Sequence, residues 1–297
     1  MKIPRFRYLR IWLKRKNERY NINYFLIVNE RNKALPGISL EFQGSLNDKQ
    51  MLTESIEKAA ELIRNAKYAI AFTGAGISVE SGIPPFRGEG GMWNSHHPIY
   101  LEIEFFRKKP LQAWKKIKEI FYDNLGDAEP NVAHEILAKM EKRSFVESII
   151  TQNVDHLHQK AGSKYVYELH GNYKQLICTE CSSEYDISFA DLNYLPPTCY
   201  VCKGILKPDM VFFNEPIPQF AKKRSFEEVN KTDLMLIIGT NAEVLPAADF
   251  PVLAKKNGAK IIEINIKKSQ LTDSISDIFL KGKATDILSR IGEYLYL

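Results

Sequence analysis

Short apolar runs alternate along the chain with longer stretches in which apolar residues recur every three or four positions. The runs predict buried strands at about 68–72, 146–150, 165–169, 233–238 and 260–265. The helical spacing predicts helices at about 45–63, 111–124, 131–142 and 247–257, and a last helix after residue 284. Strands that are mostly separated by helices predict an α/β fold with a doubly wound parallel sheet.

A glycine-rich stretch, FTGAGISVESGIPPFRGEGG (72–91), follows the first predicted strand. Glycine lets the backbone turn tightly and lets a ligand approach the main chain, and bare N–H groups after a strand suit a pyrophosphate. Gly74-Ala75-Gly76 lacks the third glycine of the usual G-x-G-x-x-G pattern. Taken alone, the stretch fits a tight strand–loop connection as well as a dinucleotide site.

Polar residues follow three other predicted strands. TQNVDHLH (151–158) follows the second, His170-Gly171 the third, and Gly239-Thr240-Asn241 the fourth. In an open α/β sheet, residues just past the strands' carboxyl ends line the ligand crevice. Asn153 and Asp155 also fit helix N-caps, and a lone histidine is commonly structural. An imidazole titrates near neutral pH, however, which suits a general base.

Two cysteine pairs, Cys178-x-x-Cys181 and Cys199-x-x-Cys202, are separated by seventeen residues. This spacing predicts a tetrahedral zinc site with four thiolate ligands. Because no ligand position is left for water, the zinc is predicted to be structural; a redox dithiol pair is the weaker alternative. No cysteine remains for disulfides elsewhere, which fits a reducing compartment and predicts a cytoplasmic location.

The N-terminus differs in charge from the rest of the chain. The chain has 297 residues and a net charge of +5, and residues 1–50 hold eleven Lys and Arg against four Asp and Glu. Residues 1–44 are predicted to be a separate basic extension: a solvated arm, a segment that weakly contacts membrane or nucleic acid, or a targeting segment. The apolar run 22–29 is a strand or a docked segment, and Pro36-Gly37 marks a turn. Ser45 is the predicted N-cap of the first helix. No run of about 18 apolar residues predicts a transmembrane helix.

Six separated motifs, taken together and in order, resemble the sirtuin family of NAD-dependent protein lysine deacylases. They are GAGISVESGIPPFRG, TQNVDHLH, His170-Gly171, the two cysteine pairs, PDMVFFNE (208–215), and Gly239-Thr240-Asn241 with Asn265 near the last strand. The resemblance covers about residues 45–297. It implies a Rossmann-like NAD-binding lobe with the zinc module inserted at about 171–208.

The resemblance also implies a role for particular residues. His170 would be the general base, with Asn153 and Asp155 also catalytic. The implied NAD-binding residues are Gly74, Ala75, Gly76, Ser78, Phe86, Arg87, Trp93, Gln152, Asn153, Val154, Asp155, Gly239, Thr240, Asn241, Asn265, Ile266, Lys267 and Ala284. The implied peptide-binding residues are Val211, Phe212, Phe213, Asn214, Glu215 and Val244, where an acyl-lysine peptide would add as a strand.

The implied reaction is deacylation of lysine in proteins or peptides. The acyl oxygen attacks C1′ of the nicotinamide ribose and nicotinamide leaves. The ribose 2′-hydroxyl then attacks the resulting O-alkylamidate, and water completes the transfer to give free lysine and O-acyl-ADP-ribose. Members that prefer acidic acyl groups carry a Tyr-x-x-Arg pair; counting from Trp114, the matching positions are Ile117 and Ile120, so a neutral acyl group is expected. Asn214 replaces a usual glycine, and asparagine tolerates the left-handed region best among other residues.

Three residues depart from the family pattern and leave their effect on activity open: Pro85, Asn214 and Asn241. Three alternatives to lysine deacetylation remain. One is mono-ADP-ribosyl transfer at the same NAD site. Another is removal of longer acyl chains. The third, of a different class, is a non-enzymatic zinc-ribbon binding protein, against which the ribbon (173–207) shows no basic face, since four of its seven charges are acidic.

Overall fold

The computed structural model describes residues 14–15, 18–19, 39–88, 90–125 and 128–297. The chain divides into two compact units, Met1–Gln50 and Met51–Leu297. In the first unit, β1 (Lys14–Arg15) and β2 (Glu18–Arg19) pair antiparallel. The rest of the predicted basic extension up to residue 38, including the apolar run 22–29 and the turn at 36–37, lies outside the described residues.

Helix α1 runs from Ser39 to Asn65. The predicted start at Ser45 is therefore wrong, because Ser45 lies inside the helix. A Ser-x-x-Asp pattern is a local preference for a helix end, and it is overridden where the backbone continues its own hydrogen bonding on both sides. In the second unit the apolar side chains of this helix face inward as predicted, with Ile56 and Ile63 buried.

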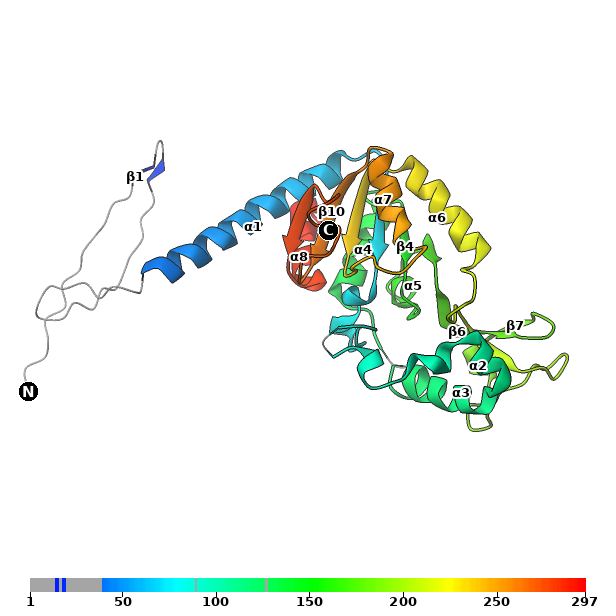
Figure 1. The fold of residues 1–297 in the computed structure, drawn as a ribbon. Helices are drawn as coiled ribbons and strands as arrows, with labels where there is room; N and C mark the ends of the chain where they lie inside the picture. The colour runs from blue at the N-terminus through cyan, green and yellow to red at the C-terminus, as the bar shows by residue number, and fades with distance from the viewer. Residues whose placement is uncertain (1–13, 16–17, 20–38, 89, 126–127) are drawn as a thin grey trace, which may run out of the picture. The chain divides into compact units, whose positions relative to one another are not determined.

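The second unit is built on a six-stranded parallel sheet, which confirms the predicted fold class (Figure 1). Its strands are β3 (Ala69–Thr73), β4 (Ser148–Thr151), β5 (Val166–Glu168), β9 (Leu234–Ile238), β10 (Lys260–Asn265) and β11 (Ile278–Lys281). Their order is β11-β10-β9-β3-β4-β5. Successive strands are therefore added on one side of β3 up to β5, and on its other side from β9 onward. The boundary between β3 and β9 is the topological switch point, where open α/β sheets bind ligands. The short strand β11 was not predicted.

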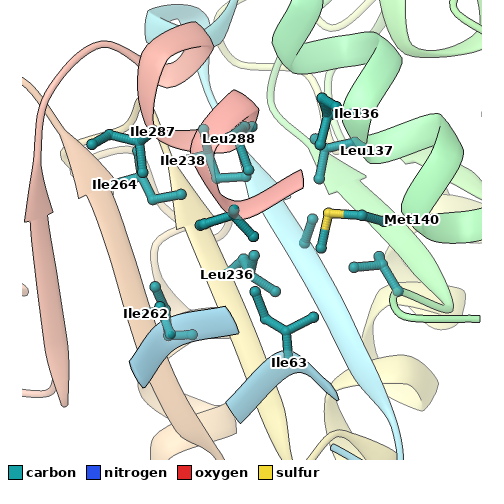
Figure 2. Close-up of a cluster of buried hydrophobic side chains, with 14 of the residues drawn as sticks. Ile63, Ile136, Leu137, Met140, Leu236, Ile238, Ile262, Ile264, Ile287 and Leu288 are labelled. Atoms are coloured by element: carbon teal, nitrogen blue, oxygen red, sulfur yellow. The ribbon is translucent and has the colours of Figure 1, made fainter. Parts of the chain in front are cut away.

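Helices cover both faces of this sheet. One face packs against α1, α4 (Val132–Lys142) and α8 (Ala284–Leu295), as Figure 2 shows for Ile63, Met140 and Leu288. The other packs against α6 (Gln219–Lys231), which was not predicted, and α7 (Asp249–Lys256). The alternation within β3 explains this arrangement: Ala71 belongs to the first cluster and Phe72 to the second. Because both faces are covered, the strands are apolar throughout.

A smaller lobe lies between β3 and β9 in sequence. It contains α2 (Ile103–Lys108), α3 (Pro110–Ile117), the π-helix η5 (Lys118–Asp123), and an antiparallel sheet of β6 (Gly171–Cys178), β7 (Glu184–Asp186) and β8 (Leu206–Met210). The Trp114 indole N–H donates to the Leu206 carbonyl at 2.7 Å and ties the helices to this sheet. The predicted helix 111–124 is thus present, but its last part is a π-helix.

Short helices connect these elements. They are η1 (Ala75–Ile77), η2 (Val79–Ser81), η3 (Met92–Asn94), η4 (Pro98–Leu101), α5 (Leu157–Lys160) and η6 (Ile187–Phe189). Within the described part of the chain, no helix combines the length and the apolar character needed to cross a membrane.

Candidate functional site

The loops after β3 and β9 meet at the switch point. The Gly74 N–H donates to the Ile238 carbonyl at 3.0 Å, and the Gly76 N–H donates to the Gly239 carbonyl at 2.8 Å. The Gln152 side chain, from the loop after β4, donates to the Thr240 hydroxyl at 2.9 Å. Three strand ends are therefore joined at one edge of the sheet.

A pocket of about 890 Å³ opens at this edge, and most residues singled out in the sequence line it. These are Gly74, Ala75, Gly76, Phe86, Arg87, Trp93, Gln152, Asn153, Val154, His170, Val211, Phe212, Phe213, Asn214, Glu215, Gly239, Thr240, Asn241, Val244, Asn265, Ile266, Lys267 and Ala284. A pocket of this size suits a ligand larger than a single amino acid. Ser78 and Asp155 are the exceptions, since neither lines the pocket.

Ser78 and Asp155 lie behind the pocket wall and bond to each other. The Ser78 hydroxyl donates to Asp155 Oδ2 at 2.7 Å, and the Asn153 amide donates to Ser78 Oγ at 3.1 Å. Burial raises the pKa of the Asp155 carboxyl, partly offset by the bonds from Leu157 and Ser78. The Asn153 side-chain oxygen is buried, and no described residue donates to it. Since buried acceptors are normally satisfied, this oxygen suits a ligand with an N–H donor.

His170 occupies the junction of the large and small lobes, immediately before β6. Its Nδ1 lies 2.9 Å from the Gln152 carbonyl, and because a carbonyl only accepts, Nδ1 carries the proton. Nε2 is then the basic nitrogen of the ring. Burial lowers the pKa of His170, partly offset by the bond to Gln152. Only glycine fits at position 171 beside this junction, because a Cβ there would lie 1.9 Å from the Asp209 carbonyl oxygen.

The segment Met210–Glu215 forms the wall of the pocket that faces the small lobe. The Val211 N–H donates to the His170 carbonyl at 2.8 Å, and the Phe213 N–H donates to the Leu101 carbonyl at 2.8 Å. Among the described residues, no backbone N–H donates to the Val211 carbonyl. Asn214 has a φ of 70°, so the expectation that asparagine keeps the left-handed turn here is confirmed.

Several apolar residues of the pocket wall were not found from the sequence, three of them next to the small lobe. Leu101, Phe121 and Met210 line the pocket from η4, η5 and β8. Leu101 and Phe121 belong to no motif, and Met210 lies in PDMVFFNE without a role of its own; their meeting depends on how the small lobe packs. Apolar periodicity alone marks such residues as core.

The opposite end of the pocket is lined by loops after β10 and β11. The Asn265 amide donates to the Thr240 carbonyl at 3.2 Å, and its side-chain oxygen accepts from the Ile266 N–H at 2.9 Å. Lys283 pairs with Glu80 at 2.8 Å, and the Thr285 hydroxyl also donates to Glu80. These contacts lower the pKa of Glu80 against the raising effect of its burial. They join the loop before α8 to the glycine-rich stretch.

The four cysteines come together at the end of β6 and in the loops of the small sheet. Their sulfur atoms all lie within 4.8 Å of one another. Cys178 and Cys202 are 3.4 Å apart, and Cys181 and Cys199 are 3.6 Å apart. Zn–S bonds of about 2.3 Å in a tetrahedron place sulfurs about 3.8 Å apart, so the cluster fits one zinc ion. None of the four lines the pocket, which agrees with a structural metal.

The strand order, the pocket at the switch point and the four-cysteine insertion define an α/β protein of the dinucleotide-binding type with a structural metal module. Residues 74–246 match the model of the Sir2 family. The chain is 41% identical over 238 residues to the NAD-dependent protein deacylase 2 of Pyrobaculum aerophilum, covering 79% of this chain and 93% of that protein. It is 42% identical over 243 residues to the NAD-dependent protein deacetylase of Thermodesulfovibrio yellowstonii, covering 80% of this chain and 94% of that protein.

Solved structures agree with these relatives. A structure described as Sir2–p53 peptide–NAD+ superimposes with a TM-score of 0.73 at 33% identity and covers 80% of this chain and 96% of that one. The chain belongs to the Sir2 family, as its motifs predicted.

Proposed function

We propose that this protein is an NAD-dependent lysine deacetylase that acts on neutral acyl groups of proteins or peptides. The observation that carries the proposal is the placement of His170. Its protonated Nδ1 is held by Gln152, and the residue lines a pocket between the switch-point loops and the segment Met210–Glu215. A neutral imidazole between a cofactor crevice and a peptide-binding edge suits a general base.

The residues at the switch point fit NAD. The orphan oxygen of Asn153 suits the N–H of the nicotinamide carboxamide, and Asn265 and Thr240 offer polar groups at the far end of the pocket. When bound, NAD supplies the ribose carbon that receives the acyl oxygen, with nicotinamide as leaving group. His170, with Nε2 as its basic nitrogen, would accept a proton from a ribose hydroxyl. The apolar rings of Phe86 and Trp93, 5.6 Å apart, help exclude water from this end of the pocket.

The substrate would lie along Met210–Glu215. The Val211 carbonyl is available to accept from the amide N–H of acyl-lysine, and Val244 would flank the peptide from the other side. Strand addition uses backbone bonds, so many peptide sequences would be accepted. The four cysteines would hold a zinc ion that stabilises the sheet carrying this segment and takes no part in proton transfer.

The acyl group is proposed to be neutral because the side chains of the small lobe near the pocket are apolar. Ile117 and Ile120 are buried in an apolar cluster, and Leu101, Phe121 and Met210 form an apolar part of the pocket wall. No counter-ion for a succinyl carboxylate is present among these residues. Cleavage of succinyl-lysine peptides faster than acetyl-lysine peptides would contradict this assignment.

Mass spectrometry of an acetyl-lysine peptide, with and without NAD, tests the proposal. We expect loss of acetyl only with NAD, and a loss at least about 10²-fold slower with the His170→Ala variant. NAD turnover with the acetyl group retained would contradict deacetylation. It would point instead to longer acyl groups or to ADP-ribosyl transfer.

Two further assignments rest on the sequence. A cytoplasmic location is supported by the gathering of all four cysteines in one metal site, which a reducing compartment preserves. Weak contact of the basic residues 1–44 with nucleic acid or membrane is supported by their charge. Salt-dependent DNA binding that is lost on deleting residues 1–38 would support the nucleic-acid role.

A further inference from the structure

Lys207 of β8 is a buried cation outside the pocket lining. Only 8% of its side chain is exposed. Its three donors all have acceptors: the Pro208 carbonyl at 3.0 Å, the Met210 carbonyl at 2.8 Å, and Glu215 Oε2 at 3.0 Å. The ammonium group also lies 4.2 Å from the centre of the Phe212 ring. A lysine is fully satisfied by three acceptors, so this site is built for a charged ammonium group.

Such burial is costly in free energy and needs a reason. Desolvation lowers the pKa of Lys207, while the partner Glu215 raises it. An apolar residue at this place would avoid the desolvation. Two of the three acceptors are backbone carbonyls, those of Pro208 and Met210, so the charge of Lys207 fixes the backbone next to Val211.

Lys207 and Glu215 together hold both sides of Val211. Lys207 binds the Met210 carbonyl directly, and Glu215 Oε2 accepts from the Phe212 N–H at 2.8 Å. The backbone groups that precede and follow Val211 are therefore turned toward the ion pair. The third anchor is the bond from the Val211 N–H to the His170 carbonyl. Between these anchors, the Val211 carbonyl accepts from no backbone N–H of the described residues.

The same lysine connects this segment to the metal module. In the register of β6 and β8, Lys207 is opposite Ile177, and its neighbour Leu206 is opposite the zinc ligand Cys178. The segment is thus fixed by the metal module at one end and by Glu215 at the other.

We propose that the Lys207–Glu215 pair is a positioning device that sets the Val211 carbonyl for the acyl-lysine amide, and so controls affinity for the peptide but not for NAD. The inference rests on the proposed function, in which Met210–Glu215 binds the substrate. Lys207 contacts neither peptide nor cofactor and acts only through the backbone it holds.

The test compares K207M, K207R and E215Q with the full-length wild type. The matched control is K255M, which removes another lysine from an ion pair, with Asp277 at 2.6 Å, outside the pocket lining. Fluorescence anisotropy gives the Kd of a fluorescein-labelled acetyl-lysine peptide, calorimetry gives the Kd of NAD, and zinc content reports on the module.

We expect K207M to weaken peptide binding about tenfold or more, as loss of a charged hydrogen bond does. NAD affinity and zinc content should stay at the wild-type level, K207R should bind the peptide more tightly than K207M, and K255M should behave as wild type. E215Q keeps the shape of the side chain and should still weaken peptide binding severalfold.

Wild-type peptide affinity in K207M, or equal losses for peptide and NAD, would overturn the inference. If K207M loses zinc, its peptide affinity is not informative, and E215Q becomes the test. An E215Q variant with wild-type peptide affinity would then overturn the inference. A wild-type protein that binds acetylated and unmodified peptide equally would overturn the proposed function and this inference with it. Preference of the wild type for acetylated peptide, with unaffected variants, would remove the positioning role alone.

Discussion

Gly76 and Gly239 pack backbone against backbone at the switch point of the sheet. A Cβ at Gly76 would lie 2.6 Å from the Gly239 Cα, and a Cβ at Gly239 would lie 2.5 Å from the Ile77 nitrogen. Gly239 also has a φ of +63°. The glycines are therefore required by the contact between two loops, and the same contact leaves the pocket above it open to a ligand.

Gly239→Ala should destabilise the protein by about 3 kcal/mol or more, because it combines left-handed strain with a backbone collision. Chemical denaturation measures this loss. Gly258→Ala is the control, since Gly258 has a φ of +96° and nothing within 4 Å of its Cβ position. It should cost about 1 kcal/mol through strain alone. Equal losses in the two variants would show that the contact between the loops is unimportant.

His170 should give the pH–rate profile an acid limb below pH 6.5. Burial lowers its pKa, so the neutral base persists at neutral pH and activity falls only as the pH drops through that lowered pKa. His170→Ala should reduce kcat by about 10²–10⁴ and remove this limb. The measurement is kcat/KM across the pH range, because kcat/KM reports the pKa of the base in the free enzyme. An acid limb centred above pH 6.5, or one that survives in the variant, would contradict the assignment.

Cys199→Ser should release zinc and abolish turnover. Cys199 is buried, and the module that it closes includes the strands next to His170 and Met210. Zinc content, far-UV circular dichroism and turnover should show loss of metal and activity while most of the large sheet is retained. Tyr185→Phe is the control, because it removes only the hydroxyl 3.1 Å from the Cys199 sulfur. Full activity in zinc-free protein would contradict the structural role.

His134 should make the fold sensitive to acid. It is buried and lies 3.4 Å from the Ser78 hydroxyl, and burial lowers its pKa to about 4. The unfolded state takes up a proton near pH 6.5 and the folded state does not, so stability is intact above that pH and is lost as the pH falls toward 4. Protonation of this one histidine in the unfolded state lowers the free energy of unfolding by about 3 kcal/mol between pH 6.5 and 4.

The measurement for His134 is the free energy of unfolding as a function of pH. His134→Gln should be less stable at neutral pH, because a buried hydrogen-bonding group is changed, but should lose less further stability between pH 6.5 and 4. A slope equal to that of the wild type would show that His134 does not titrate on unfolding.

The sequence was most informative where one residue type suffices for a structural role. Apolar runs such as 233–238 are strands because both faces of the sheet are covered, and residues after the strands meet because parallel strands end at one edge. The cysteine spacing likewise predicted one four-sulfur cluster.

What could not be predicted depends on packing between distant segments. The start of α1 at Ser39, the four-residue strand β11 and the helix α6 carry no strong local signal. Phe121 lines the pocket from a π-helix, and Ser78 lies behind the wall rather than on it. A phenylalanine or a serine can lie on the pocket wall or behind it, and only the tertiary structure decides between the two positions.

In the proposed mechanism, lysine deacylation and NAD cleavage are one reaction at this pocket. The most direct measurement is the product balance by mass spectrometry after turnover of an acetyl-lysine peptide with NAD. We expect one nicotinamide and one O-acetyl-ADP-ribose for each lysine freed. Free acetate without nicotinamide, or ADP-ribose attached to protein with the acetyl group still on lysine, would contradict it.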